Sequence, residues 1–392
     1  MTEALFWTAV ATLAYTFVGY PALVWSLARL RPRPVRRADV RPTVTVLVAA
    51  YNEAGNIARR IENCLALDYP ADRLEIVVAS DGSTDATVEI ARRYEASPPS
   101  APTVRVIAYP WRRGKPCVLN ETIPECRGEI VVLADARQRY EPSAVRRLVE
   151  NFADRAVGAA SGELCLVNEA GVAVGEGVGA YWRYEKLIRR SESAFDSTVG
   201  ATGAVYAIRR ALFEAMPPDT LLDDVLIPVR IARRGFRVVF DARARAWDHA
   251  AGSARHEYTR KVRTIAGVAQ LFSRERWLLL PVHRLWVQAV SHKLLRLAAP
   301  FLMIGALACA ALLAPRSPVY AAALTAQVAF YAAATAGAVL GRGRGALSRM
   351  LAMPYTFCLL NVTTLVALAR LASGRQQIQW RKAGDAGARR AA

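Results

Sequence analysis

Two aspartates follow apolar runs in the first third of the chain. Asp81 comes after Ile76–Ala79 and a serine, and Asp135 comes directly after Glu129–Ala134. Apolar runs of this length, bounded by turn residues, are typical of buried strands. Open parallel sheets bind nucleotides beyond the carboxyl ends of their strands, where a carboxylate can accept hydrogen bonds from a base or a ribose. The pattern therefore predicts a nucleotide site at one sheet edge, with a purely local turn role for Asp81 as the alternative.

Charged residues suited to a different chemistry occur at two later turns. Lys115 follows two arginines and a glycine, and the pair Asp223-Asp224 precedes a helical pattern. A lysine can neutralise a phosphate group, and a carboxylate can take a proton from a hydroxyl as a general base. The alternatives are an exposed loop lysine and an N-cap aspartate, because aspartate is common at that helix position.

Strand and helix patterns alternate through the segment that carries these residues. This order is typical of parallel strands joined by helical crossovers, so we predict an α/β fold with a Rossmann-like, mostly parallel sheet. A helix that continues to Ile231 is expected to tolerate Pro228 only in its first turn. Residues 157–175 show no clear pattern. The predicted strands are 44–50, 74–79, 104–109, 129–134, one within 200–210, and 236–240, and helices are predicted from Ile57, after Ser83 and from Val118.

The composition of the 392-residue chain is typical of a membrane protein. Hydrophobic residues make up 53% of it. Much of the excess lies in four stretches, each close to the ~20 residues that cross a ~30 Å hydrocarbon core. The net charge of +19 could indicate nucleic-acid binding, but many arginines flank the apolar stretches, which is typical of positive-inside anchoring. The four stretches are 4–28, 297–314, 318–340 and 351–373.

These patterns predict the organisation and the location of the chain. The arginines between residues 29 and 41 place the following domain on the cytoplasmic side of a multi-pass protein of the cell membrane. The basic, aromatic region before the second stretch is expected to lie at the membrane surface. The predicted parts are an anchor with a basic juxtamembrane segment (1–42), a catalytic domain (43–270), an amphipathic interface segment (271–296) and a transmembrane region with a tail (297–392).

Six motifs, in order, resemble those of the membrane-bound family 2 glycosyltransferases. The chain looks most similar to the cellulose synthase and poly-N-acetylglucosamine synthase group, and the resemblance covers roughly residues 43–270. It implies a GT-A nucleotide-sugar-binding domain flanked by transmembrane helices. The motifs are Val48–Glu53, Ser80–Asp85, Gly114-Lys115 with Leu119-Asn120, Asp135, Gly203–Arg210 and Asp223-Asp224.

The resemblance also implies roles for individual residues. Asp224 looks like the family's catalytic base, and Lys115 like the cation that faces the donor diphosphate. Asp135 stands where the family's Asp-x-Asp motif begins, which implies that it binds a divalent cation, Mg²⁺ or Mn²⁺. The other substrate-binding residues implied by the resemblance are Ala50, Tyr51, Glu53, Asp81, Gly203, Asp223, Arg260 and Arg263.

Two departures from the family pattern bear on function. The Asp-x-Asp motif reads Asp135-Ala136-Arg137 here. Either Asp135 and the donor phosphates hold the metal, or Arg137 partly replaces its charge. The polymerising members carry Gln-x-x-Arg-Trp, of which Arg263-Thr264 retains only the arginine. Because an aromatic face suits a sugar ring, its loss predicts one or a few transfers per acceptor.

The sequence is therefore predicted to encode a membrane-bound, inverting glycosyltransferase. The donor is a nucleotide-sugar, predicted to be UDP-linked, and the acceptor is a membrane-associated glycan or lipid. The predicted partners are the donor, the acceptor and the lipid bilayer, with no nucleic acid. The alternatives are a polysaccharide synthase that makes a long polymer and a non-catalytic membrane protein that binds nucleotide-sugars. A P-loop nucleotide hydrolase is not indicated, because the sequence lacks Gly-x-x-x-x-Gly-Lys-[Ser/Thr].

Overall fold

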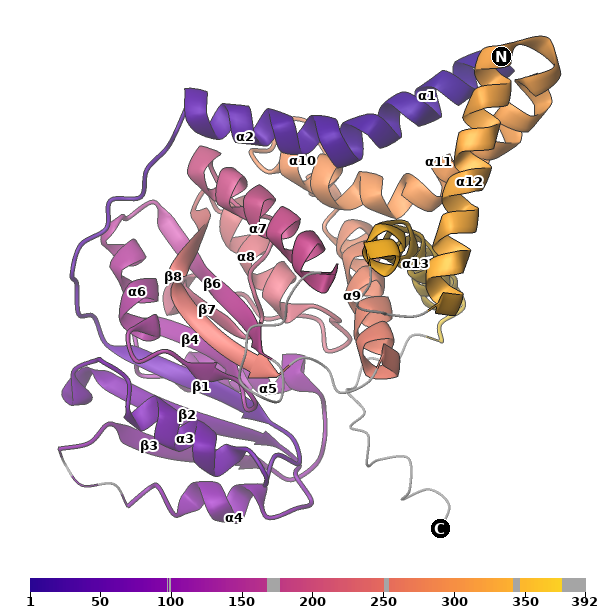
Figure 1. Ribbon diagram of the computed structural model, residues 1–392. Coiled ribbons are helices and arrows are strands. Elements are labelled where there is room, and N and C mark those ends of the chain that lie inside the picture. The colour runs from indigo at the N-terminus through magenta and orange to yellow at the C-terminus, as the bar shows by residue number, and fades with distance from the viewer. Residues whose placement is uncertain (97, 99, 168–176, 250–253, 341–345, 376–392) are drawn as a thin grey trace, which may run out of the picture. The chain divides into compact units, whose positions relative to one another are not determined.

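The computed structural model describes residues 1–392 except 97, 99, 168–176, 250–253, 341–345 and 376–392 (Figure 1). Two compact units make up the structure. Each unit is formed by segments that are far apart in the sequence. The domain boundaries predicted from the sequence stay predictions. The sheet unit is formed by Arg33–Ala173 and Asp196–Ala250, and the helical unit by Met1–Pro32, Val174–Phe195 and Ala251–Gln376.

Eight strands of the described residues form one sheet, in the order β3-β2-β1-β4-β7-β6-β8-β5 (Figure 1). The neighbours from β3 to β4 are parallel, as are β6 and β8, whereas β7 is antiparallel to β4 and β6, and β5 to β8. The predicted α/β fold with a mostly parallel sheet is confirmed. The strands are β1 (Val44–Ala50), β2 (Leu74–Asp81), β3 (Thr103–Tyr109), β4 (Ile130–Asp135), β5 (Arg139–Tyr140), β6 (Val157–Val167), β7 (Val205–Arg209) and β8 (Arg237–His249).

Helices cover both faces of this sheet. Val46 and Val48 of β1 are buried in one cluster with Ile61 and Val145, which belong to α3 and α6. Because side chains alternate along a strand, the buried Leu47 points to the opposite face. The helix α5 packs on β1 and β2, and α8 packs on β6 and β8. The helices of this unit are α3 (Ile57–Leu65), α4 (Thr87–Arg92), α5 (Lys115–Glu125), α6 (Ala144–Glu150) and α8 (Asp223–Arg233).

Two elements differ from the sequence-based expectation. The helix α5 begins at Lys115 rather than Val118, with a proline in its first turn, where the missing N–H costs no helical hydrogen bond. The strand β6 fills residues 157–167, for which no pattern was apparent. Its first seven residues are all buried, so they show no apolar–polar alternation. The rest of that unassigned stretch, 168–175, lies outside the described residues.

The position of Pro228 also differs from the expectation. The helix α8 begins at Asp223, so Pro228 lies in its second turn, and the expectation of a first-turn proline was wrong. A proline there removes the N–H that would bond to the carbonyl four residues earlier. That carbonyl belongs to Asp224, and it accepts a hydrogen bond from the N–H of Ala201 at 2.7 Å.

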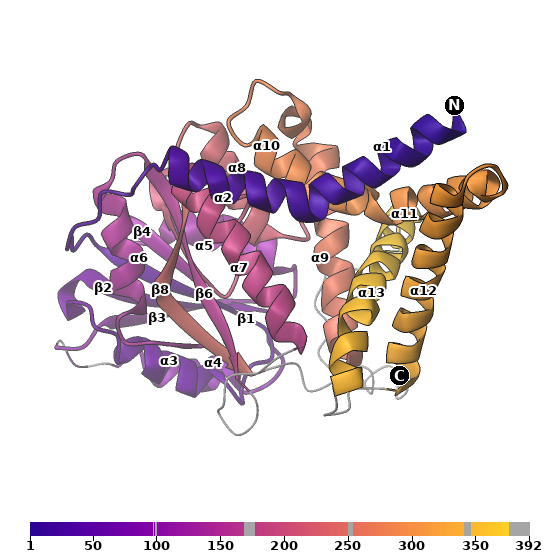
Figure 2. The same cartoon turned by 45° about the horizontal axis from the view of Figure 1, so that its top comes forward.

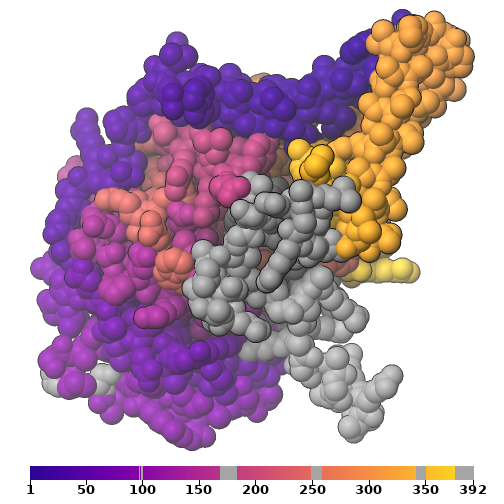
Figure 3. Space-filling model, viewed as in Figure 1, coloured from indigo at the N-terminus to yellow at the C-terminus, as the bar shows by residue number. Residues whose placement is uncertain are grey.

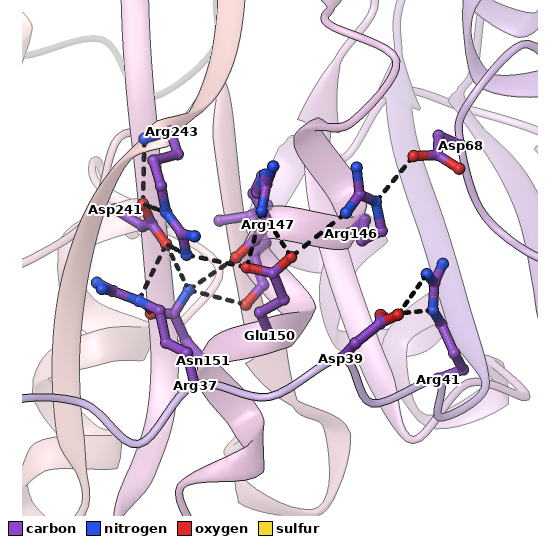
Figure 4. Close-up of polar contacts among 11 residues, drawn as sticks. Arg37, Asp39, Arg41, Asp68, Arg146, Arg147, Glu150, Asn151, Asp241 and Arg243 are labelled. Atoms are coloured by element: carbon purple, nitrogen blue, oxygen red, sulfur yellow. Dashed lines mark hydrogen bonds and ion pairs between the residues drawn. The ribbon is translucent and has the colours of Figure 1, made fainter.

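The basic segment after the first apolar stretch is attached to the sheet unit. Arg33 forms an ion pair with Asp196 at 2.6 Å. Arg37 donates to Asn151 at 2.9 Å and lies 3.4 Å from Asp241 (Figure 4). The segment, dark indigo in Figure 3, is visible at the left edge of that view. Some of the arginines that were expected to flank a membrane anchor therefore also pair with carboxylates of the sheet unit.

The helical unit contains four helices that are long and apolar enough to cross a membrane, among the residues that were described. They match the four predicted stretches, although the second begins earlier, at Trp286, so that part of the predicted interface segment continues an apolar helix. The four are Thr2–Leu30, Trp286–Arg316, Pro318–Leu340 and Met350–Ala372.

These four candidate spans comprise several helical elements, and the unit contains two further helices. Within it, α12 packs beside α11 and α13 (Figures 1 and 2). The helices are α1 (Thr2–Ala14), α2 (Tyr20–Leu30), α7 (Gly177–Phe195), α9 (Ala254–Arg274), α10 (Trp286–Gln288), α11 (Leu295–Leu313), α12 (Pro318–Leu340) and α13 (Ala346–Ala372), with π-helical turns at Tyr15–Gly19 and Ala289–Leu294.

A buried polar network fixes α7 within the helical unit. The hydroxyl of Tyr20 donates to Glu192 at 2.6 Å. The ring of His292 lies between two carboxylates, 2.8 Å from Glu192 and 3.2 Å from Glu185. Buried polar groups are costly unless they are paired, so this network favours one arrangement of α7 against α2 and the π-helical turn.

Candidate active site

The carboxyl ends of three central strands meet at one edge of the sheet (Figure 1). The parallel register places Ala49 of β1 beside Asp135 of β4, and Ala50 beside Ser80 of β2. Asp81 of β2 and Asp135 of β4 therefore end the two strands that flank β1, at one edge of the sheet, as their apolar runs predicted. This is the edge at which open α/β sheets bind nucleotides.

Lys115 lies in the first turn of α5 and contacts two acids. Its Nζ is 3.1 Å from Oδ1 of Asp135 and 3.1 Å from Oδ2 of Asp223. Burial opposes the charge, but the carboxylates of Asp135, Asp223 and Asp224 raise the pKa of Lys115 above its usual value. The side chain is 22% exposed, so Lys115 is a charged member of an acidic cluster rather than an exposed loop lysine.

Asp223 and Asp224 are the first two residues of α8. The N-cap is Leu222, without a side-chain capping bond, so the alternative of an N-cap aspartate was wrong. Oδ2 of Asp224 accepts a hydrogen bond from the N–H of Gly203 at 3.0 Å. A Cβ at position 203 would lie 2.6 Å from that oxygen, so this approach requires glycine. The loop before β7 thus holds the carboxylate predicted to be the base.

Tyr206 is a site neighbour that the sequence did not single out. Its hydroxyl lies 3.5 Å from Oδ2 of Asp223, and the residue is fully buried on β7. Burial, followed by the charges of Asp223 and Asp224, raises the pKa of Tyr206 well above its usual value. The phenol is therefore neutral, borders the cluster and donates a hydrogen bond to Asp223.

Asp81 holds the loop that leads to Lys115. Its two carboxylate oxygens accept the backbone N–H groups of Arg113 at 2.7 Å and Gly114 at 2.8 Å. Gly82 has φ +63°. Because it has no Cβ, the backbone of Trp111 and Arg112 can pack directly against it. The alternative of a purely local turn role for Asp81 was wrong, because its partners lie more than 30 residues away. Its contact with a nucleotide stays a prediction.

The residues after β1 form a loop tied to the one after β2. The N–H of Asn52, at φ 52°, donates to Ser83 at 3.0 Å, and the N–H of Glu53 donates to Thr87 at 2.7 Å. The guanidinium of Arg112 lies 3.8 Å from the ring centre of Tyr51. These contacts place the predicted binding residues Ala50, Tyr51 and Glu53 at the same edge as Asp81.

Arg137, at the position of the family's second acid, is turned toward β8. Its Nη2 lies 3.2 Å from Oδ2 of Asp248, which also accepts a hydrogen bond from Gln138 at 2.9 Å. The charge of Arg137 is therefore balanced within the protein. No sequence pattern singled out Asp248, because the pairing of β5 with β8 brings it to this turn.

Asn120 belongs to the Leu119-Asn120 motif, to which the sequence assigned no role. Its side-chain amide donates to the carbonyl of Met216 at 2.7 Å and accepts the N–H of Met216 at 2.8 Å. This pair of bonds joins α5, which carries Lys115, to the segment that leads into α8. Lys115 and the two aspartates of α8 are thereby positioned by a shared contact.

Arg260 and Arg263 are two further residues to which the resemblance assigns a role in substrate binding. Both lie on α9, which belongs to the helical unit. Their role at the donor diphosphate stays a prediction.

Comparison with known proteins shows a family model and several relatives to which this chain is similar. Residues 45–216 match the model of the family described as "Glycosyl transferase family 2". The beta-monoglucosyldiacylglycerol synthase of Synechocystis is 28% identical over 253 residues, which are 59% of this chain and 52% of that one. The poly-beta-1,6-N-acetyl-D-glucosamine synthase of Staphylococcus aureus is 24% identical over 56% of this chain and 52% of its own. The chain thus spans about half the length of the curated relatives it matches.

A solved structure resembles nearly the whole chain. The mannosyltransferase PcManGT from Pyrobaculum calidifontis, in complex with GDP-Man and Mn²⁺, is 26% identical, with a TM-score of 0.72. The likeness covers 96% of this chain and 100% of that one. It therefore includes both the sheet and the flanking helices.

Proposed function

We propose that this chain, whose residues 45–216 match the family 2 glycosyltransferase model, is a glycosyltransferase that transfers the sugar of a UDP-linked donor to a membrane-associated glycan or lipid with inversion at the anomeric carbon. The observation that carries the proposal is the cluster of Lys115, Asp135 and Asp223, with Asp224 adjacent, at the carboxyl edge of the sheet. The cluster supplies a cation for a leaving diphosphate and a base for an acceptor hydroxyl.

The reaction assigns one task to each oxygen of Asp224. Oδ2 is held by the N–H of Gly203, and the second oxygen accepts the proton of the acceptor hydroxyl. The acceptor oxygen then forms a bond to the anomeric carbon from the face opposite the diphosphate. The bond from that carbon to the diphosphate oxygen breaks, and its electron pair leaves with the nucleotide. The ammonium of Lys115 neutralises the charge that develops there.

A divalent cation, Mg²⁺ or Mn²⁺, fits this site through Asp135. Its carboxylate is 40% exposed, and Arg137, which could have replaced the cation, is paired with Asp248. The described residues contain no group of three His, Cys, Asp or Glu side chains able to hold a metal, so phosphate oxygens of the donor would complete the coordination. When bound, the cation would neutralise charge on the diphosphate.

A membrane-associated acceptor is supported by two observations. The chain has four helices suited to cross a membrane, and its relatives include a synthase of a glucosyldiacylglycerol. The arginines that follow the first of these helices favour the cytoplasmic side of the cell membrane for the sheet unit.

Synthesis of a long polymer is a second candidate, favoured by the likeness to a poly-N-acetylglucosamine synthase. Against it, Thr264 stands where polymerising members carry tryptophan. Its hydroxyl donates to the carbonyl of Arg260 at 3.0 Å, and it has no aromatic face for a sugar ring. We therefore favour one or a few transfers per acceptor.

The test is transfer by membranes that contain the full chain, supplied with a panel of radiolabelled UDP- and GDP-linked sugars. We expect one donor to label a membrane-bound product of low molecular weight. High-molecular-weight polysaccharide made by the purified chain would instead support the polymer synthase. Absence of transfer from every donor, with Mg²⁺ or Mn²⁺ present, would contradict the proposal.

A further inference from the structure

Pro228 lies in the middle of the helix that carries the proposed base. The helix α8 spans Asp223–Arg233, and Pro228 is buried in its second turn. Proline is strongly unfavourable in a helix interior, because it has no N–H and its ring crowds the carbonyl four residues earlier. A helix-forming residue such as alanine would suit this position better by local preference alone.

The carbonyl that Pro228 leaves without a helical donor is that of Asp224. This carbonyl accepts the N–H of Ala201 at 2.7 Å. An alanine at position 228 would bring an N–H to the same oxygen and close the regular bond of an α-helix. The carbonyl oxygen can accept two hydrogen bonds, so the proline spares it a helical N–H that would share it with the loop before β7.

The same loop also binds the side chain of the base. Gly203 donates its N–H to Oδ2 of Asp224 at 3.0 Å, and no side chain larger than hydrogen fits between them. Two backbone N–H groups, those of Ala201 and Gly203, therefore hold the carbonyl and the carboxylate of one residue. Because Asp224 is held at both its carbonyl and its carboxylate, the carboxylate has less freedom to turn away from an acceptor hydroxyl.

We propose that Pro228 is a positioning residue for Asp224. It leaves the Asp224 carbonyl available to the N–H of Ala201. This hydrogen bond positions the loop that orients the Asp224 carboxylate. The inference rests on the proposed function, since it takes Asp224 as the base. It also explains why a residue that local helix preference disfavours lies at this place, for functional sites tolerate such conflicts.

The test compares Pro228→Ala with Pro124→Ala in the full chain. Pro124 is the matched control, because it also lies inside a helix, α5, near its end. For Pro228→Ala we expect kcat to fall by roughly tenfold to a hundredfold, as for a small misplacement of a catalytic group, with the KM for the donor within about twofold. Its Tm is expected to change little, because the helical hydrogen bond gained is offset by the weakened bond from Ala201 and by the greater freedom of the unfolded chain. Pro124→Ala is expected to leave kcat unchanged.

Amide hydrogen exchange supplies a readout that does not need activity. We expect the peptide containing Ala201 and Gly203 to exchange faster in Pro228→Ala than in the unmodified protein, and to be unaffected by Pro124→Ala. Unchanged exchange there, or a kcat loss that matches a fall in Tm, would overturn the inference. If the unmodified protein transfers no sugar, the proposed function fails, whereas the exchange result still decides whether Pro228 seats the loop.

Discussion

Two clusters of charged residues in the sheet unit differ in how their charges are balanced. In the cluster of Figure 4, Asp241 lies 2.7 Å from Arg243 and 3.4 Å from Arg37, and Glu150 lies 3.0 Å from both Arg147 and Arg243. Each buried acid there is surrounded by guanidinium groups. At the active-site edge, by contrast, one lysine faces three acids.

The difference separates a structural cluster from the one that we propose is reactive. Burial opposes the charge of Asp241, but hydrogen bonds from Arg243 and Asn151 lower its pKa below the usual value. That cluster is satisfied by the protein alone. The carboxylates around Lys115 instead lie at the carboxyl edge of the parallel strands, where a nucleotide-sugar is expected to bind, which is why we propose that the chemistry occurs there.

Removing the proposed base should have the largest effect on the reaction. Asp224→Asn keeps the shape of the side chain and an oxygen for Gly203, but it cannot take the acceptor proton. We expect transfer to fall by roughly 10² or more, the usual contribution of a general base, while donor binding stays within about threefold. The measurement is initial rates with the active donor, alongside nucleotide titration. Near-normal rates would remove Asp224 from the mechanism.

Removing Lys115 from the acidic cluster should act on both donor binding and rate. Lys115→Met leaves Asp135 and Asp223 without their shared cation and takes a positive charge from the diphosphate site. We expect kcat/KM for the donor to fall by roughly tenfold to a hundredfold. Lys115→Arg, which keeps the charge, should recover part of the loss. If Lys115→Met binds the donor and transfers the sugar as well as the unmodified chain does, the cluster around Lys115 is not the reactive one.

Loss of the Asp81 carboxylate should weaken donor binding more than the chemical step. Asp81→Ala frees the N–H groups of Arg113 and Gly114, so the loop before Lys115 loses its anchor. We expect nucleotide affinity to fall by roughly tenfold, about the effect of losing a charged hydrogen-bond acceptor. Calorimetric titration with UDP measures it. An unchanged affinity would limit Asp81 to a structural role.

The structural cluster should respond in stability and not in rate. Asp241→Asn removes the charge that pairs with Arg37 and Arg243, and we expect a loss of about 1–3 kcal/mol in the free energy of unfolding, since both arginines are partly exposed. Tm and kcat are measured on the same preparation. A kcat that falls as in Asp224→Asn would erase the distinction between the two clusters.

The pH dependence of stability should show the smallest effect, with a definite sign. Because the folded pKa of Asp241 is lowered, its stabilising contribution is present above the ordinary pKa of about 3.9 and is lost as pH falls through the folded value. The Tm difference between the unmodified chain and Asp241→Asn should therefore be constant from neutral pH to about pH 5 and shrink below about pH 4. A difference that grows in acid would contradict the assignment.

Most of the sheet could be predicted because its strands carry their own signals. The strands β1, β2 and β4 are mostly apolar runs that end at turn residues, and two of them deliver Asp81 and Asp135 to one edge. The strand β6 could not be predicted, since burial of consecutive residues removes the alternation that marks a half-buried strand.

The amino-acid sequence by itself determined the parallel strands, the apolar helices and the residue types of a transfer reaction, because local patterns encode all three. Only the tertiary structure decided which charges meet. Lys115 and Asp223 are far apart in the chain but lie 3.1 Å apart, and Arg137 meets Asp248 through the pairing of β5 with β8. Pro228 shows the same limit, since its missing N–H matters only because Ala201 lies against the Asp224 carbonyl. Such contacts follow from packing between elements, which residue spacing along the chain does not specify.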